Sequence, residues 1–278
     1  GSTVDILYGR VNPGGRLPES FPMKLENNPS HLNFPGEGNI VSYREGVFAG
    51  YRYYEKKKIP VLFPFGFGLS YTTFEYSNLT LSSDSIKDTD TLSVSVDVTN
   101  TGKMCGKEVV QLYVSDRETT VNRPVKELCG FEKASLLPNE TKTITFKLDK
   151  RAFAYYNSEL GDWHVESGEF EITAAKSSAE PVLTKTVYVQ STVELPRTYT
   201  PNSIYLDLNK DERAMELLDP LLNKTIFGES RETSEAEQEA LGDMLDAMLK
   251  FMPLRGLTGF GDVSLEDINE LVDKLNKL

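Results

Sequence analysis

Two glutamates in an aromatic-rich stretch are the residues whose type and spacing come nearest to a reacting pair. Glu37 lies in PGEGN and Glu45 in YREGV, eight positions apart. Paired carboxylates beside aromatic side chains are typical of sugar-hydrolysing sites, where one carboxyl group protonates the leaving oxygen and the other attacks the sugar or activates water. The alternative is structural, since Arg44 or Arg52 is near enough in sequence to form an ion pair with either glutamate.

A run of aromatic residues between positions 51 and 67 offers flat apolar faces, which suit the CH face of a pyranose ring. The same residues also suit a docking seam between domains, which requires no ligand, and we favour that interpretation. Left exposed, so many aromatic side chains would form a larger apolar patch than monomeric proteins usually tolerate. The series is Tyr51, Tyr53, Tyr54, Phe63, Phe65 and Phe67.

Groups that ligate metals or act as nucleophiles are few and scattered. His31 and His164 are the only histidines and lie in different segments, which supports neither a histidine metal site nor a Ser-His-Asp triad. Cys105 and Cys129 are the only cysteines, and we expect both to be free thiols. We therefore predict no metal-binding and no cofactor-binding residue.

One loop concentrates charged residues between two expected strands. The stretch SDRETTVNRPVKEL carries Asp116, Arg117, Glu118, Asn122 and Arg123. We favour a solvated inter-strand loop. The alternative is a loop that leans on neighbouring domains and braces the rim of their active site, because loops gather at the ends of β-sandwiches.

The charge balance excludes two classes of partner. Formal net charge is −12, and residues 207–278 hold 17 Asp and Glu against 8 Lys and Arg. An acidic chain without a basic stripe repels phosphate backbones and anionic lipid, so we expect no nucleic-acid and no membrane partner. No apolar run approaches the roughly 20 residues of a membrane-spanning helix.

The elements that must position these residues fall into three regions. Residues 1–70 are dense in Gly, Pro and aromatics without a sustained period, which predicts an extended path over a neighbouring surface. Residues 71–192 alternate apolar and polar side chains in runs separated by turn signals, which predicts about seven short strands in an immunoglobulin-like sandwich. The runs include Phe74 to Leu81, Leu92 to Val98, Val110 to Val114, Ile144 to Leu148, Phe170 to Ala174 and Thr184 to Gln190.

Residues 193–278 carry helical periods and predict a small amphipathic helical unit. Ser234 and Glu237 form a capping box before an apolar face that Pro253 ends, and a further helix begins at Ser264. A weaker pattern from Ala214 to Leu222 contains Pro220, which either kinks the helix or starts a new one after Asp219. The apolar residues of the two clear helices are Leu241, Met244, Leu245, Met248, Leu249 and Met252, and then Leu265, Ile268, Leu271, Val272, Leu275 and Leu278.

Several stretches, taken together and in order, resemble the closing part of bacterial glycoside hydrolase family 3 β-glucosidases. They are DILYGRVNPGGRLPESFP, YREGVFAGYRYYEKKKIPVLFPFGFGLSYTTFEYSNL, NRPVKELCGFEKASLLPNETKTITFKLD and WHVESGEFEI. The resemblance implies that residues 1–70 are the end of an α/β sandwich domain with its linker, and that residues 71–192 are a fibronectin type III-like domain. The last region resembles an extension found on some of these enzymes.

The same resemblance implies a retaining β-glucosidase whose two catalytic carboxylates lie upstream of this chain. It places Glu37 and Glu45 in the connecting segment, so we expect no catalytic residue here. The expected role is to stabilise and orient the upstream catalytic domains, which hydrolyse terminal β-linked glucose without metal or organic cofactor. The alternatives are a carbohydrate-binding or adhesion module, and an oligomerisation element in the helical region. The chain begins with Gly-Ser and then enters an apolar run without a start residue or signal peptide, so we expect removed upstream sequence, which would have carried any targeting signal. We expect a cytoplasmic rather than a secreted enzyme.

Overall fold

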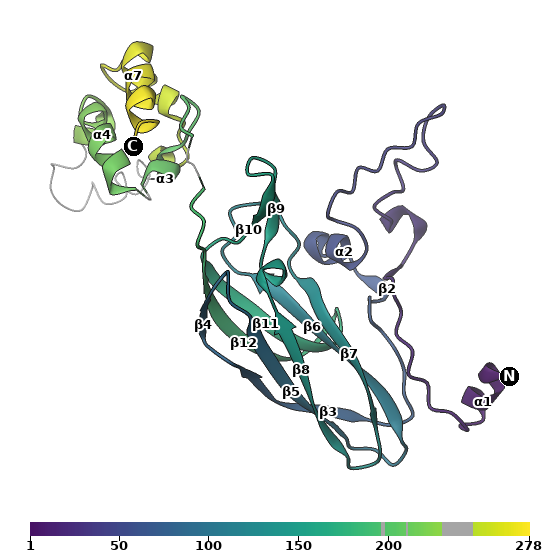
Figure 1. Ribbon diagram of the computed structural model, residues 1–278. Coiled ribbons are helices and arrows are strands. Elements are labelled where there is room, and N and C mark those ends of the chain that lie inside the picture. The colour runs from purple at the N-terminus through teal and green to yellow at the C-terminus, as the bar shows by residue number, and fades with distance from the viewer. Residues whose placement is uncertain (196–197, 210, 230–246) are drawn as a thin grey trace, which may run out of the picture. The chain divides into compact units, whose positions relative to one another are not determined.

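The computed structural model describes residues 1–195, 198–209, 211–229 and 247–278 (Figure 1). They form two compact units, Gly1–Glu194 and Leu195–Leu278. The first unit contains the connecting segment, residues 1–70, together with a β-sandwich, and the second contains helices. The predicted fold class, mainly β with α-helices, is confirmed.

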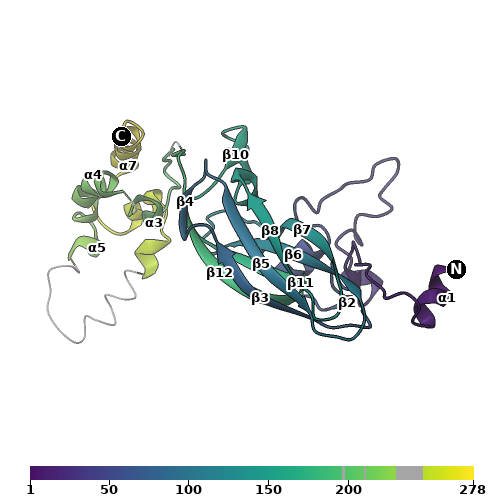
Figure 2. The same ribbon diagram turned by 60° about the horizontal axis from the view of Figure 1, so that its bottom comes forward.

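The sandwich is built from strands in which buried residues alternate with more exposed ones. In β5 (Leu92–Asn100), the side chains of Leu92 and Val96 are fully buried, because alternate residues of a strand point to opposite faces. One sheet has five strands in the order β4-β12-β11-β6-β7, and the other has three in the order β3-β5-β8 (Figures 1 and 2). The other strands are β3 (Phe74–Leu81), β4 (Ser85–Lys87), β6 (Gly106–Asp116), β7 (Glu127–Leu136), β8 (Thr141–Leu148), β11 (Gly168–Ser177) and β12 (Glu180–Gln190).

Side chains from both sheets meet in one hydrophobic core. Phe170 of β11 meets Phe153 edge to face with ring centroids 5.3 Å apart, and both rings are fully buried. Phe153 follows a short turn, η2 (Lys150–Ala152), which leads into a hairpin of β9 (Tyr155–Asn157) and β10 (Asp162–His164). The hairpin projects from one end of the sandwich in Figure 1. It was not predicted, because its strands are too short to show a period.

A buried asparagine organises the predicted turn after β5. The Asn100 side-chain amide donates to the carbonyl oxygens of Met104, at 2.7 Å, and Leu136, at 3.1 Å. Its side-chain oxygen accepts from the hydroxyl of Thr72, at 2.6 Å, and from the backbone N–H of Gly102. All the hydrogen-bonding capacity of this side chain is used, which is the condition for burying an amide at low cost.

The connecting segment contains only short elements. They are α1 (Ser2–Leu7), β1 (Phe21–Pro22), η1 (Leu25–Asn27), α2 (Tyr51–Lys57) and β2 (Val61–Phe63), and β1 pairs with β2. Figure 1 shows α2 and β2 beside the sandwich at β6 and β7. Residues 51–68 lie against a neighbouring surface, which belongs to the same chain, but their path is not extended throughout as predicted, because residues 51–57 form helix α2.

The second unit has its own core. Leu208, Leu218 and Ile268 are fully buried there. The helix predicted to begin at Ser264 is present, and Ser264 caps it. The Ser264 hydroxyl accepts from the Asp267 N–H at 3.1 Å, and the Asp267 carboxylate accepts from the Ser264 N–H at 2.8 Å. The helices are α3 (Tyr205–Leu208), α4 (Glu212–Leu222), α5 (Ile226–Glu229), residues 247–250, η3 (Leu254–Gly259) and α7 (Leu265–Leu275).

Two expectations for this unit have different outcomes. Helix α4 continues through Pro220 to Leu222, so no new helix begins after Asp219. The capping box of Ser234 and Glu237 and the apolar positions 241, 244 and 245 lie outside the described residues. Within the described ranges, no helix is both long and apolar enough to cross a membrane.

Candidate functional site

An aromatic cluster binds the connecting segment to the outer face of the five-stranded sheet. Tyr51 of α2 stacks on Phe65 with ring centroids 4.9 Å apart, and it meets Tyr113 of β6 edge to face at 5.9 Å. The Tyr51 hydroxyl accepts a hydrogen bond from the backbone N–H of Leu128 at 2.8 Å. Burial raises the pKa of Tyr51 and of Tyr113, so both hydroxyls stay protonated across the physiological range. We call this cluster the aromatic seam.

The aromatic seam accounts for part of the predicted series. Phe63 instead packs on Phe67 within the connecting segment, with centroids 5.1 Å apart, and Tyr53 packs edge to face on Tyr54 at 5.5 Å. The seam was expected between upstream domains. Its observed partner is the sandwich of the same chain, because β6 presents Tyr113 on the face opposite the core.

A glycine lets the backbone pass close to this sheet. Gly66 has φ +80°, and a Cβ atom there would lie 2.1 Å from the side-chain oxygen of Gln111. The Gln111 amide donates to the carbonyl oxygen of Gly66 at 3.2 Å and to that of Lys176 at 2.7 Å. The PFGFG motif therefore has a physical reason for glycine at this position.

A network of charges holds α2 to the β6–β7 loop. Arg52 contacts Glu127 at 3.1 Å, and Arg123 contacts both Glu127 and Asp116 at 3.3 Å. Arg123 also donates to the carbonyl oxygen of Phe153 at 3.1 Å. Burial raises the pKa of Asp116, although Arg123 opposes that shift. Arg123 is 7% exposed, so this cation is a structural anchor rather than a solvated loop residue.

A second ion pair lies beside the aromatic seam. Lys126 contacts the Glu55 carboxylate at 3.3 Å and donates to the carbonyl oxygen of Ser178. Its ammonium group also lies 5.4 Å from the centroid of the Tyr113 ring. Burial raises the pKa of Glu55, although Lys126 opposes that shift.

A third ion pair anchors the connecting segment at Arg16, well before α2. Arg16 contacts the Glu108 carboxylate at 2.5 Å, and the Tyr76 hydroxyl donates to the same carboxylate at 2.9 Å. Glu108 is 1% exposed, and burial raises its pKa. Sequence reasoning missed this pair. The available signal was a charged residue at Glu108, in phase with the buried positions Val110 and Leu112 of the same strand.

The part of the connecting segment that precedes α2 exposes large apolar side chains. Leu32 is 92% exposed and Tyr43 is 90% exposed. Isolated exposed apolar residues are ordinary, but a concentration of them in about forty residues indicates a surface that another body covers. Other exposed members are Leu7, Tyr8, Met23, Leu25, Phe34 and Ile40.

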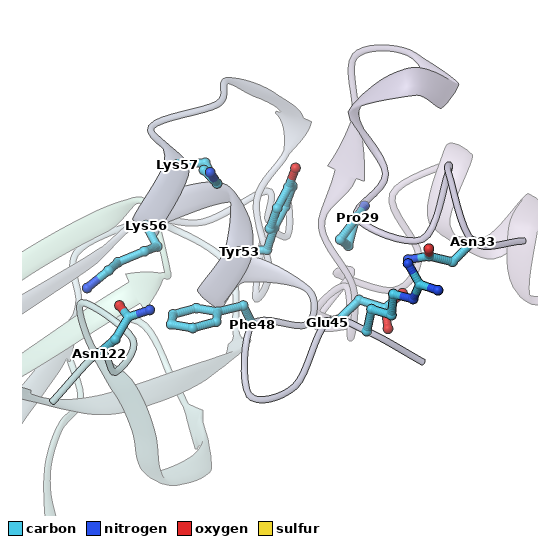
Figure 3. Close-up of a pocket in the computed structure, with 9 residues that line it drawn as sticks. Pro29, Asn33, Glu45, Phe48, Tyr53, Lys56, Lys57 and Asn122 are labelled. Atoms are coloured by element: carbon cyan, nitrogen blue, oxygen red, sulfur yellow. The ribbon is translucent and has the colours of Figure 1, made fainter. Parts of the chain in front are cut away.

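A hollow of about 470 Å³ lies between the connecting segment and the β6–β7 loop (Figure 3). Phe48 and Tyr53 supply its aromatic faces, and Asn122 closes it from the loop. Figure 3 shows Phe48 between Asn122 on one side and Glu45 on the other. Arg44, Lys56 and Lys57 add cationic groups, and Pro29 and Asn33 complete the lining.

The two glutamates singled out in the sequence differ in position. Glu45 lines the hollow, whereas Glu37 does not and is exposed in a backbone bridge with Ile40. The ion pair expected for these glutamates is absent among the described residues, because Arg52 contacts Glu127 instead.

The histidines and cysteines occupy separate places. His31 is exposed, whereas His164 is buried and packs edge to face on Tyr155 at 5.7 Å, and burial lowers the pKa of His164. Both cysteines are free thiols, as predicted. Burial raises the pKa of Cys129 to about 12. The described part of the chain contains no cluster of three or more His, Cys, Asp or Glu that could hold a metal.

The loop between β6 and β7 is held at several points. Glu166 accepts from the backbone N–H and the hydroxyl of Thr120, and from the Thr119 hydroxyl at 3.2 Å. Arg117 contacts Glu171 on the sheet surface at 2.5 Å. With Arg123 buried, the interpretation of this stretch as a solvated loop is wrong for Asp116 and Arg123, although Asn122 remains exposed.

Comparisons with known proteins agree with this architecture. Residues 1–71 match the glycosyl hydrolase family 3 C-terminal domain, and residues 108–178 match a fibronectin type III-like domain. The chain is 51% identical over 280 residues to thermostable β-glucosidase B of Acetivibrio thermocellus, covering 100% of this chain and 36% of that relative. It is 50% identical over 189 residues to a β-glucosidase of Kluyveromyces marxianus, covering 67% of this chain and 22% of that relative.

Solved structures of β-glucosidases also match this chain. The crystal structure of a family 3 β-glucosidase from Bifidobacterium adolescentis matches with a TM-score of 0.66 and 39% identity, covering 72% of this chain and 30% of that one. The Acetivibrio relative matches along the whole chain, helical unit included, whereas the Kluyveromyces relative matches about two thirds of it. The chain therefore belongs to glycoside hydrolase family 3 and corresponds to the C-terminal part of the β-glucosidases of that family.

Proposed function

We propose that this chain is the non-catalytic C-terminal part of a retaining β-glucosidase and that it stabilises and orients the catalytic domains. The observation that carries the proposal is the contrast between two parts of the connecting segment. Residues 51–68 are bound to the sandwich through the aromatic seam and its ion pairs. Residues before α2 expose the apolar side chains that a covering body would bury.

The acidic residues support a role without catalysis. A retaining glycosidase places two carboxyl groups roughly 5–5.5 Å apart across the reacting carbon. Glu45 lines the hollow without Glu37. The buried carboxylates of Asp116 and Glu108 and the half-buried carboxylate of Glu55 are each in contact with a cation. Glu55 and Glu108 anchor the segment to the sandwich, and Asp116 fixes Arg123 in the β6–β7 loop.

The relatives support a β-glucoside as the substrate of the whole enzyme. The Kluyveromyces enzyme, whose crystal structure contains glucose, matches with 48% identity and a TM-score of 0.62 over 67% of this chain and 22% of that one. The whole enzyme would then hydrolyse terminal β-linked glucose, with the catalytic carboxylates supplied by upstream domains.

The test of the non-catalytic role is an assay of the purified chain with 4-nitrophenyl β-D-glucopyranoside. We expect no turnover above the uncatalysed background, and the same result for Glu37→Gln and Glu45→Gln. Turnover by the unaltered chain that either substitution abolishes would overturn the proposal.

The oligomerisation role of the helical unit stays a prediction. Sedimentation of the chain with and without residues 195–278 tests it, and equal association states of the two would refute it.

A further inference from the structure

The β9–β10 hairpin holds a buried histidine. His164 is 5% exposed, and its Nδ1 atom is buried without a hydrogen-bond partner in the part of the chain that the structure describes. We propose that this hairpin is an acid-sensitive switch, which opens when His164 binds a proton and then releases the β6–β7 loop from Glu166. The proposal concerns the conformation of this chain alone, so it does not depend on the proposed function.

The hairpin is small, and its two faces carry different aromatic pairs. In the register of β9 and β10, Tyr155 is opposite His164 and Tyr156 is opposite Trp163. Because alternate residues of a strand point to opposite faces, the first pair lies on one face and the second on the other. His164 packs edge to face on Tyr155, and Trp163 packs in the same way on Tyr156 with ring centroids 5.4 Å apart. A two-stranded hairpin is marginally stable by itself, so these ring contacts decide whether it stays closed.

Protonation makes the buried position of His164 unfavourable. A neutral imidazole has one nitrogen that accepts a hydrogen bond and one that donates, whereas an imidazolium donates from both. In the imidazolium, the N–H group at Nδ1 would be buried without an acceptor among the described residues, and a positive charge would be buried with it. Both changes carry a cost of desolvation, which the ring avoids if it moves out of the core.

The charged groups near His164 do not cancel this effect. Burial lowers the pKa of His164, and Lys150 of η2 lowers it further, whereas Glu166 and Asp88 oppose the shift without reversing it. The Asp88 carboxylate is itself buried and accepts a hydrogen bond from the Thr192 N–H at 3.0 Å. Glu166 is only half-buried, so it is the carboxylate that an imidazolium can reach on leaving the core.

Glu166 connects the hairpin to the β6–β7 loop. Its carboxylate accepts hydrogen bonds from the backbone N–H and from the hydroxyl of Thr120. An imidazolium from His164 competes with these donors for the same oxygens, and the charged donor forms the stronger hydrogen bond. The base of the hairpin stays in place, because Phe153 and Val165 are fully buried in the core of the sandwich. Opening is therefore local and does not unfold the domain.

The single tryptophan of the chain measures the opening. Trp163 pairs with Tyr156 in the hairpin, so its fluorescence changes when the hairpin opens. We expect a reversible change in emission of the whole chain between about pH 8 and pH 4.5, with a midpoint below the usual histidine pKa of about 6.5. His164→Phe should abolish the change, because it keeps a ring against Tyr155 but binds no proton. His164→Gln should also abolish it and keeps the test valid if the first variant folds poorly. His31→Gln, at the exposed second histidine, is the matched control and should titrate like the unaltered chain.

Release of the loop is measured separately, by the NMR chemical shift of the Thr120 amide proton. This shift should change with the same midpoint in the unaltered chain and should not change with that midpoint in the His164 variants. The amide proton of Leu128, which donates to the Tyr51 hydroxyl, is the control and should keep its shift. Constant Trp163 emission across the pH range, or a change that survives both His164 substitutions, would overturn the proposal. A Thr120 shift that does not follow the emission would overturn it as well.

Discussion

The hydroxyl of Tyr51 accepts a hydrogen bond from the backbone N–H of Leu128 at 2.8 Å, across 77 positions of sequence. This contact joins a helix of the connecting segment to strand β7 of the sandwich. Together with the stacking of Tyr51 on Phe65, it gives the segment both a polar and an apolar attachment. We therefore expect the connecting segment and the sandwich to unfold together in one cooperative transition.

Substitutions at Tyr51 test that attachment. Tyr51→Phe leaves the Leu128 N–H without its partner and should lower the free energy of unfolding by about 1–3 kcal/mol. Tyr51→Ala also removes the buried ring and should cost about 3–5 kcal/mol. Urea denaturation of the whole chain measures both, with Tyr156→Phe and Tyr156→Ala as controls at an exposed ring. Equal midpoints for the two alanine variants would contradict the account.

The Arg16–Glu108 pair predicts a pH-dependent defect. Arg16→Met leaves a buried carboxylate without its cation and should cost about 3 kcal/mol at pH 7. The folded-state pKa of Glu108 is raised by burial, and losing Arg16 raises it further. Stability linked to such a group is fully present below its unfolded pKa of about 4.3 and is lost as the pH rises through the folded pKa. The penalty should therefore shrink toward pH 4.

Denaturation of the unaltered chain and of Arg16→Met from pH 4 to 7.5 measures how the stability penalty depends on pH. Arg117→Met, which removes an ion pair at the surface, is the control and should show little effect at any pH. A penalty for Arg16→Met that is constant, or that grows as the pH falls, would count against a buried carboxylate with a raised pKa.

Gly66 predicts a sharp difference between two glycines of similar backbone conformation. Gly66 and Gly161 have φ of +80° and +64°, but a Cβ at Gly161 meets no atom within 4 Å. Gly161→Ala should cost about 1–2 kcal/mol for the left-handed conformation alone. Gly66→Ala should cost clearly more, because the methyl group would displace the buried Gln111 side chain and break its hydrogen bonds to the Lys176 carbonyl oxygen and the Tyr113 hydroxyl. Thermal denaturation of the two variants compares them, and equal losses would refute the close approach.

The thiols should react at very different rates. Cys105 is exposed, whereas the pKa of Cys129 is raised to about 12 by burial, and the thiolate is the reactive form. Titration with a disulfide reagent at pH 8 should modify one thiol per chain rapidly in the native state and the second only after denaturation. Cys105→Ser should abolish the rapid phase, and a rapid phase that survives in that variant would contradict the assignment.

The strands and the last helix could be predicted because their periods and caps are local. Leu92 to Val98 alternate cleanly, and Ser264 with Asp267 forms a complete cap within four residues. The β9–β10 hairpin and α2 could not be predicted in this way. The hairpin strands are three residues each, and α2 derives its stability from tertiary burial of Tyr51 and Tyr54 rather than from an amphipathic period.

The functional region was only partly readable from sequence. The aromatic series indicated a docking seam with upstream domains, whereas Tyr51 and Phe65 pack on the sandwich of the same chain. Nothing local in the sequence identifies Tyr113 as their partner or pairs Arg16 with Glu108 across 92 positions. The hollow likewise depends on Phe48 and Asn122, which tertiary folding brings to one place. The sequence indicates such non-local pairs only weakly, for example through a charged residue at a buried position of a strand.

The most direct test of the supporting role is reconstitution. The part of the Acetivibrio enzyme outside the matched 280 residues is produced alone, and β-glucosidase activity is measured with and without this chain added in trans. The account predicts little activity without the chain, recovery when it is added, and weaker recovery with Leu32→Ser and Tyr43→Ser, which alter the exposed apolar surface. Full activity without the chain, or equal recovery by that double variant, would contradict the claim that this part stabilises and orients the catalytic domains.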